Sequence, residues 1–320
     1  MKTDPHQALA ILKGAKALPD LYDVLAELGM GPGWNKPEPS LWPHPRKTFA
    51  PAHWSYEIAR AALDAAGPLI STEQAERRNL ILNNPVPGNT YATARTIVAA
   101  YQMVLAHETA RNHRHTPNAL RLVIEAAPNN FTIVDGAKIP MLPGDVLLTP
   151  NWQWHAHANE SDESAYWIDF LDAPLVQLLE PMFLEHSGVT DTSLGEQPQS
   201  PMRFAFADTM ARLDQAEANP DGSREITLGD PALDSIALRV TRLEAGAATA
   251  RLRTTANNIY AVIDGEGHTT IDGQPFAWRR GDVIVAPAWR EHHHTAQAQA
   301  HLLCVTDEPV LKALRWLRRS

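Results

Sequence analysis

The most constraining feature of this sequence is a motif that occurs twice, at residues 144–157 and 281–294. The copies read GDVLLTPNWQWHAH and GDVIVAPAWREHHH, so glycine, aspartate, valine, proline, tryptophan and two histidines fall at the same offsets. An Asp-Gly pair, the strongest short signal for a β-hairpin turn, precedes each copy at Asp135-Gly136 and Asp272-Gly273. The sequence therefore predicts a duplicated β-domain.

The segments around the two motifs support an all-β fold made of two tandem β-barrels with an N-terminal helical arm. From about residue 79 onward, short apolar runs alternate with turn residues, as in barrels and sandwiches. Helices are expected at 7–28, 56–66, 174–186 and 311–319. The predicted division is listed in chain order: arm 1–70, first barrel 71–190, linker 191–223, second barrel 224–310, C-terminal helix 311–320.

Composition excludes several classes of protein. The net charge of −9 argues against a nucleic-acid partner, which requires a basic face. No run of about 18 apolar residues is present, so we expect no membrane span. A single cysteine, Cys304, excludes an intrachain disulfide, and no signal peptide is recognisable. We therefore expect a cytoplasmic protein.

Three of the fourteen histidines form a candidate metal site. His113 and His115 are two positions apart on a predicted strand, so both imidazoles point to the same face. His155 follows from a later strand. Three nitrogen ligands leave other coordination positions open, as a catalytic metal requires. Nitrogen ligands alone are compatible with iron, zinc, nickel or manganese.

The second motif lacks most of this site. Leu252 and Thr254 align with His113 and His115, and only His292 and His294 remain. We therefore expect one metal ion per chain and a structural role for the second barrel. A solvated or supporting role is expected for its histidines, and an ordinary surface role for His107, His186 and His268.

The first barrel resembles the cupin pattern, in which a strand histidine pair is followed by Gly144-x5-Pro150-x4-His155-x3-Asn159. The glycine that usually precedes the histidine pair is absent, and Trp152 stands where cupins commonly have a second glycine. A glutamate ligand is common four positions after the second histidine in cupins. Ala119 stands there in this chain, so the resemblance implies a site of three histidines.

A finer resemblance is to gentisate 1,2-dioxygenase and its relatives that act on salicylates and 1-hydroxy-2-naphthoate. The segments that carry it are 75–78, 101–104, 113–116, 119–122, 149–157 and 167–174. This resemblance implies an extradiol-type ring-cleaving dioxygenase with one Fe(II) per chain. Such an enzyme inserts O2 between the carboxyl-bearing and hydroxyl-bearing carbons of gentisate or a substituted salicylate, in the catabolism of aromatic compounds. It also implies a homo-oligomer, either a tetramer or a dimer.

The same resemblance implies substrate-binding roles for Gln102, Arg121, Arg77 and Trp167. Arginine grips a carboxylate in a bidentate manner, and Arg121 shares the face of the histidine pair if one strand continues without a bulge. A surface salt bridge is an equally good interpretation of Arg77. Trp167, together with Trp152 and Trp154, is a candidate wall for an aromatic pocket.

His157 and Asp169 are the candidate catalytic residues. His157 has the strand parity of His155, so it faces the same side without being a fourth ligand. Asp169 is expected either to orient His157 or to accept a proton from the substrate hydroxyl, unless it is only a turn residue. Relatives usually have Asp-His-Gly after the third ligand, where this chain has Ala156-His157-Ala158. A salicylate with one ring hydroxyl is therefore an alternative to gentisate.

Two other functions stay open at this point. The chain is alternatively a non-catalytic bicupin that binds a small molecule, which would not need the complete histidine trio beside Arg121 and Gln102. It is alternatively another cupin enzyme, such as an isomerase or a flavonol-type dioxygenase. The absence of a glutamate at Ala119 weighs against that class.

Overall fold

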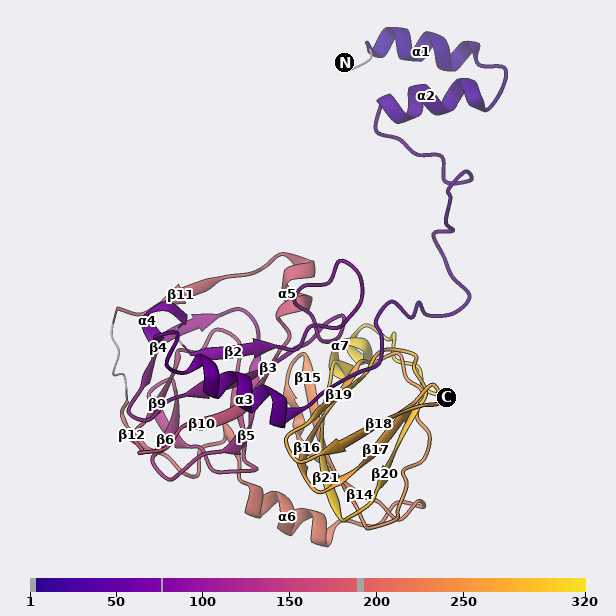
Figure 1. Ribbon diagram of the computed structural model, residues 1–320. Coiled ribbons are helices and arrows are strands. Elements are labelled where there is room, and N and C mark those ends of the chain that lie inside the picture. Colours follow the sequence, from indigo (N-terminus) through magenta and orange to yellow (C-terminus); the bar gives the residue numbers. More distant parts are fainter. Residues whose placement is uncertain (1–3, 76, 189–192) are drawn as a thin grey trace. The chain divides into compact units, whose positions relative to one another are not determined.

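The computed structural model describes residues 4–75, 77–188 and 193–320 (Figure 1). The chain separates into two units, Met1–Arg46 and Lys47–Ser320. The first unit contains α1 (Pro5–Gly14) and α2 (Pro19–Glu27) where one helix was expected over 7–28. Pro19 begins a new helix, and the Asp20 carboxylate accepts hydrogen bonds from the backbone N–H groups of Lys16 and Ala17.

The second unit begins with a strand and a helix. The helix α3 (Tyr56–Ala66) has the expected bounds, and Ser55 caps its N-terminus. The preceding strand β1 (Ala52–Trp54) pairs with β19 (Val283–Ala286) of the second barrel. The end of the expected N-terminal arm thus contributes a strand to the second barrel. A short helix, α4 (Thr72–Ala75), leads into the first barrel.

The first barrel consists of two six-stranded sheets. One sheet has the order β13 (Arg203–Phe204), β8 (Val146–Thr149), β5 (Ala119–Glu125), β10 (Ala165–Leu171), β3 (Val98–Val104), β2 (Arg78–Ile81). The other has the order β11 (Leu184–His186), β4 (Thr109–His115), β9 (His155–Asn159), β6 (Asn130–Val134), β7 (Ala137–Pro140), β12 (Gly195–Glu196).

The second barrel repeats this plan with a six-stranded and a three-stranded sheet. The larger sheet has the order β1, β19, β16 (Asn258–Asp264), β21 (Ala300–Thr306), β15 (Ile236–Leu243), β14 (Arg224–Leu233). The smaller has the order β18 (Gln274–Arg279), β17 (Glu266–Ile271), β20 (His292–Ala296). The predicted fold class, an all-β chain with two barrels, is confirmed.

Two helix predictions were too long or displaced. The helix expected over 174–186 is α5 (Ala173–Leu179), because Glu180 adopts a left-handed φ of 73° and a proline follows. The end of that range forms strand β11 instead. The helix expected over 311–319 is α7 (Glu308–Ala313), and Arg315 beyond it has a φ of 60°.

The connection between the barrels carries more structure than a linker. It contains β12, β13 and α6 (Phe206–Gln215); β13 pairs with β8 of the first barrel, and α6 packs against β14 of the second. Residues 189–192, where the expected first barrel ends and the linker begins, lie outside the described residues. Among the described residues, no helix has the length and apolarity that crossing a membrane requires.

Strand registers show the duplication more clearly than the sequence does. Arg121 pairs with Asp169 in the first barrel, and Tyr260 pairs with Cys304 at the corresponding place in the second. The hairpin turns also match, with φ angles of 46° and 85° at Asp135-Gly136 and of 46° and 86° at Asp272-Gly273. The registers therefore relate residues of the two barrels that share no chemical similarity.

The repeated Gly-Asp pair holds the first residue of one helix at each barrel. Asp145 accepts a hydrogen bond of 2.8 Å from the backbone N–H of Phe206, the first residue of α6. Asp282 does the same for Tyr56, the first residue of α3. The aromatic ring of each of these first helix residues packs directly against the preceding glycine. A Cβ at Gly281, for example, would stand 2.5 Å from Tyr56 Cδ1. The motif thus holds the start of α6 at the first barrel and the start of α3 at the second, while the body of α3 packs on β2 and β3 of the first barrel and that of α6 on β14 of the second (Figure 1).

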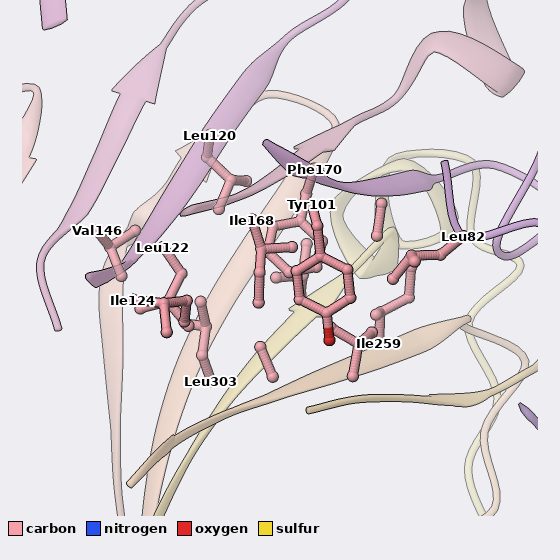
Figure 2. Close-up of a cluster of buried hydrophobic side chains, with 14 of the residues drawn as sticks. Leu82, Tyr101, Leu120, Leu122, Ile124, Val146, Ile168, Phe170, Ile259 and Leu303 are labelled. Carbon is pink, nitrogen blue, oxygen red and sulfur yellow. The ribbon is translucent and has the colours of Figure 1, made fainter. Parts of the chain in front are cut away.

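One hydrophobic core joins the two barrels. Leu120 and Leu122 on β5 point outward from the first barrel and belong to the same cluster as Ile259 and Leu303 of the second (Figure 2). The residue between them, Arg121, faces the inside of the first barrel. The sheet that contains β5 is therefore buried on both faces, which explains the nearly continuous apolar runs of its strands.

Candidate metal centre and active site

Three histidine side chains meet inside the first barrel. His113 and His115 come from β4, and His155 comes from β9, which pairs with β4 at His113. The nearest potential ligand nitrogens of the three imidazoles all lie within 4.8 Å of one another. The expected spatial association of these histidines is thus present in the fold.

Local backbone contacts fix the tautomer of each imidazole. Each Nδ1 lies 2.8 to 3.1 Å from the carbonyl oxygen of a residue two positions away in the chain. A carbonyl oxygen only accepts hydrogen bonds, so each Nδ1 carries the proton. Each Nε2 therefore keeps a free lone pair, which is the state in which histidine binds a metal ion.

The charge state of the trio also suits a metal. Burial, together with the nearby Arg77 guanidinium, lowers the pKa of His113 to about 3. Burial and the neighbouring imidazoles hold the pKa of His155 well below its usual value. Both rings are neutral at pH 7, so no proton competes with a cation for Nε2.

Arg121 occupies the opposite wall and is almost completely buried. Its Nε donates to Asp169 at 3.3 Å, its Nη1 to His157 and Thr132, and its Nη2 to Thr149 at 3.3 Å. The assumption that it continues the strand of the histidine pair was wrong. A turn separates β4 from β5, and Arg121 enters the barrel from the other sheet.

His157 presents an unused hydrogen-bond donor to the interior. Its Nδ1 lies 3.2 Å from Arg121 Nη1, and a guanidinium only donates, so Nδ1 accepts and Nε2 carries the proton. This Nε2 is buried and has no partner among the described residues. Burial and the two nearby arginines keep the pKa of His157 well below its usual value. The ring lies 5.2 Å from that of Trp167.

Asp169 contacts Arg121 rather than His157. Its Oδ1 also accepts a hydrogen bond of 2.9 Å from Trp167 Nε1, and its Oδ2 lies 3.8 Å from Arg77 Nη2. The expectation that Asp169 orients His157 directly was therefore wrong, because the Arg121 guanidinium stands between them. The carboxylate fixes Arg121, which in turn fixes the imidazole.

Arg77 belongs to the interior and is not a surface residue. Its side chain is 14% exposed, and its Nε donates to Gln102 Oε1 at 3.1 Å. Its Nη1 is buried without a partner among the described residues. Two arginines thus share the single carboxylate of Asp169 in this lumen. With neutral imidazoles around them, the side chains leave one net positive charge, which favours an anionic ligand.

Trp152 and Trp154 do not line this lumen. Their rings flank Arg114, whose Cζ lies 4.5 and 4.7 Å from the two ring centroids. Arg114 falls between the two strand histidines and therefore faces the other side of β4. It also pairs with Glu185 of β11 at 2.6 Å, so these residues hold β11 against β4. Of the three tryptophans, Trp167 alone remains beside the histidines.

Sequence reasoning missed Thr132 and Thr149, which hold the Arg121 guanidinium. The duplication offered one signal, since the residue three positions before each Asp-Gly turn is a threonine, Thr132 and Thr269. Sequence reasoning also gave Ala156 too much weight. Strand alternation points its side chain away from the face that carries the neighbouring histidines, so it does not change the charge of the lumen.

The second barrel lacks the trio at the positions that alignment indicated. Leu252 bridges to His292 as His113 pairs with His155. The backbone N–H of Trp289 donates to the carbonyl of Thr254, as that of Trp152 does to His115. His292 and His294 are buried, so the solvated alternative was wrong for these two residues and the supporting role stays a prediction.

Comparison with known proteins agrees with this architecture. The family described as Cupin domain matches residues 100–171 and 239–306, one match in each barrel. A 5-aminosalicylate 1,2-dioxygenase of Comamonas sp is 33% identical, over 92% of this chain and 87% of that protein. A gentisate 1,2-dioxygenase of Streptomyces sp is 31% identical, over 95% and 96%. The crystal structure of a salicylate 1,2-dioxygenase variant from Pseudoaminobacter salicylatoxidans in complex with gentisate has a TM-score of 0.88 and 27% identity, over 96% of each chain. This chain therefore belongs to the gentisate and salicylate 1,2-dioxygenase family of ring-cleaving enzymes built from two cupin domains.

Proposed function

We propose that this protein is an Fe(II)-dependent dioxygenase that cleaves the ring of gentisate or a substituted salicylate during the degradation of aromatic compounds. Cleavage takes place between the carboxyl-bearing and the hydroxyl-bearing carbon. The bond lies beside a ring hydroxyl, which is the sense in which the reaction is extradiol-type. The observation that carries the proposal is the convergence of three free Nε2 lone pairs opposite the buried Arg121–His157 pair.

His113, His115 and His155 would hold the metal ion, one per chain. Their donor set fits a divalent transition metal, because all three rings are neutral and have Nε2 free. Fe(II), when bound, supplies a centre that brings the aromatic acid and O2 together and lets electron density pass between them. The choice of iron rests on the family to which the chain belongs.

The remaining residues of the lumen bind and orient the substrate. Arg77 offers an unpartnered Nη1 to a carboxylate, and Gln102 holds the Arg77 side chain in place. His157 donates its Nε2 proton to an oxygen atom of the substrate. Since its Nδ1 accepts from Arg121, His157 serves as a hydrogen-bond donor and not as a base. Trp167 packs beside it and provides an apolar wall.

Arg121 and Asp169 act mainly through His157. The hydrogen bonds of Arg121 to Asp169, Thr132, His157 and Thr149 engage all three of its nitrogens, so it supplies positive charge and fixes the imidazole. Asp169 fixes Arg121 and compensates part of its charge. Removing either residue is therefore expected to disturb catalysis through the position of His157, in addition to any direct contact with the substrate.

We further infer that the enzyme is a cytoplasmic homo-oligomer, a tetramer or a dimer. In it, residues 71–190 form the metal-binding barrel and residues 224–310 the barrel without metal. Its partners are a small aromatic hydroxy acid and O2, with no nucleic acid and no membrane. The single cysteine and the net charge of −9 support these assignments.

Oxygen uptake tests the proposal directly. The protein is loaded with Fe(II) under anaerobic conditions, mixed with gentisate, salicylate, 5-aminosalicylate or 1-hydroxy-2-naphthoate, and then exposed to O2. We expect stoichiometric O2 consumption and a ring-opened product with at least one of these acids. No uptake with any of them would exclude a ring-cleaving function for the proposed site.

Two alternative functions give different outcomes in the same experiment. A non-catalytic binding protein would bind one of the acids tightly without metal and consume no O2. A flavonol-type dioxygenase would consume O2 with a flavonol and not with the salicylates. Neither alternative accounts for the placement of Arg77 and His157 around the histidine trio.

A further inference from the structure

The second barrel contains a cavity of about 350 Å³ that the proposed reaction does not use. This volume lies within the range of small-molecule sites. Its lining includes Arg239, Tyr260, His292, His294 and Glu308. Pockets of this size are usually lined mostly by apolar groups. The many polar side chains in this lumen therefore call for a functional explanation.

Positive charge gathers at one end of this cavity, around Glu308. The Glu308 carboxylate lies 3.0 Å from Arg239 Nη1, 2.6 Å from Arg319 Nη2 and 2.8 Å from Lys312 Nζ. These cations lower the pKa of Glu308 to about 2, against the opposing effect of its burial. Three cations thus surround one carboxylate, which leaves a local excess of positive charge.

In total the three acids of the lining match its three cations, so the excess of positive charge is local to the end of the cavity at Glu308. Glu225 lies 3.6 Å from Arg239 Nε and also accepts a hydrogen bond from Thr241. Asp221 is turned toward the backbone, where it accepts from the N–H groups of Ser223 and Ala250. The end of the cavity at Glu308 therefore remains the place where a further anion is most stabilised.

Arg239 has donors to spare for such an anion. Its Nη1 donates to Glu308, its Nη2 to Cys304 Sγ at 3.6 Å, and its Nε lies 3.6 Å from Glu225, whereas a guanidinium has five N–H groups. Its side chain is 16% exposed and lines the cavity. A bidentate contact with a carboxylate is the geometry for which a guanidinium is best suited.

Two buried rings lie next to this cation cluster. His294 is 5% exposed, its Nδ1 bonds to Thr269, and its Nε2 has no hydrogen-bond partner in the described part of the chain. His292 Nδ1 donates a hydrogen bond to a backbone carbonyl, so its Nε2 carries no proton. The Tyr260 hydroxyl therefore donates a hydrogen bond to His292 Nε2. The Tyr260 oxygen therefore keeps lone pairs for an acceptor role, and its hydroxyl also interacts with the Cys304 thiol. These groups suit the polar substituents of a small planar ligand.

The registers show that the two barrels place positive charge differently. Arg239 pairs with Cys304 in the second barrel, where Ala100 pairs with Asp169 in the first. Tyr260 stands at the position of Arg121. The second lumen thus has no histidine trio, but it contains an arginine that the first lumen lacks at that position.

We propose that the second barrel binds a small organic carboxylate, held by Arg239 at the end of the cavity near Lys312 and Arg319. This site is separate from the histidine trio and does not depend on the proposed oxygenase reaction. The ligand is an anion with a flat or short carbon skeleton, as the volume and the neighbouring Tyr260 and His294 rings require.

Titration calorimetry at low ionic strength with benzoate tests this proposal. The full-length Arg77→Gln protein is used without added metal, so that carboxylate binding in the first barrel is weakened. We expect saturable benzoate binding that weakens about tenfold when Arg239→Gln is added, as for loss of a charged hydrogen bond. Lys312→Gln, a change at the exposed rim, is expected to weaken it about threefold through loss of charge.

Benzamide is the matched neutral probe, because it differs from benzoate mainly in charge. We expect no saturable benzamide binding under the same conditions. Equal binding of benzamide would contradict recognition of an anion. Absence of benzoate binding, or binding that neither Arg239→Gln nor Lys312→Gln changes, would overturn the site itself. The Lys312→Gln protein keeps the test decisive if Arg239→Gln fails to fold.

Discussion

Backbone contacts only two residues away set the chemistry of the histidine trio. Each Nδ1 donates to a nearby carbonyl, so the free lone pair of each ring is at Nε2 before any metal arrives. The second barrel uses the same contact at His292, where Nε2 accepts a hydrogen bond from the Tyr260 hydroxyl. The difference between the barrels is therefore what faces Nε2, and not how the histidine is held.

His113→Ala is expected to abolish iron binding and ring cleavage together, since two remaining ligands hold a metal ion weakly. His292→Ala is the control, because it removes a buried histidine from the other barrel, at the place that corresponds to His155. Elemental analysis of the purified proteins and O2 uptake give the two readouts. Iron bound in full by the His113→Ala protein would contradict the proposed ligand set.

Arg77→Gln is expected to lower kcat/KM for the aromatic acid about 10- to 100-fold, chiefly through a higher KM. The reason is the loss of the charged Nη1 donor of Arg77, which has no partner within the described residues and is therefore available to the substrate. Iron content should stay unchanged, because Arg77 does not belong to the trio. A lower kcat with an unchanged KM would instead assign Arg77 to the chemical step.

The sequence located the trio but not the network behind it. Strand alternation is local, so the spacing of His113 and His115 was enough to place them together. The contact of Asp169 with Arg121 depends on the register of β5 against β10, which no local pattern reveals. Arg121 was found for the wrong reason, because the turn between β4 and β5 was not recognised.

At the scale of elements, the Gly-Asp pair of each barrel binds the N-terminal residue of a helix. The aspartate caps a helix through its first backbone N–H group, and the glycine makes room for the aromatic residue at that position. The repeat was visible in the sequence, but its partner helices were not, because α3 and α6 lie far from the motif in the chain.

Gly281→Ala is expected to destabilise the protein by about 3 kcal/mol, because the new Cβ collides with the Tyr56 ring and the φ is 85°. Gly273→Ala is the matched control. Its φ of 86° is equally unfavourable, but nothing lies within 4 Å of a Cβ there, so a cost of about 1 kcal/mol is expected. Urea denaturation measures both changes. Equal effects would show that contact with Tyr56 contributes nothing.

Helix ends were the least predictable elements. The apolar pattern after Pro174 continues past the point where α5 stops, since Met182, Phe183 and Leu184 are also apolar. Only the left-handed Glu180 and the following proline end the helix. The strands around the core, in contrast, were recognisable as a group from their short apolar runs and turns.

At the scale of the molecule, the first unit exposes much apolar surface. Large side chains with more than a third of their surface exposed include Leu9, Leu18, Trp34, Leu41 and Trp42. A 46-residue unit with two short helices is too small to bury such groups in a core of its own. We therefore expect Met1–Arg46 to contribute to subunit contacts.

Deletion of residues 1–46 is expected to lower the oligomeric state, for instance from a tetramer to a dimer or from a dimer to a monomer. Sedimentation velocity of the full-length and shortened proteins measures this, with circular dichroism as a control for folding. An unchanged assembly would show that the apolar residues of this unit do not hold the subunits together.

The hydrophobic cluster shared by both barrels has a consequence for folding cooperativity. Leu120 and Leu122 from one barrel and Ile259 and Leu303 from the other bury one another, so neither sheet keeps a covered face if its neighbour melts. We expect a single calorimetric transition for residues 47–320. Iron bound at His113 should then raise the unfolding temperature of the second barrel as much as that of the first, which holds the metal. Two separate transitions, with only one shifted by iron, would contradict this coupling. The second barrel is then retained because it completes the thermodynamic unit on which the metal centre depends.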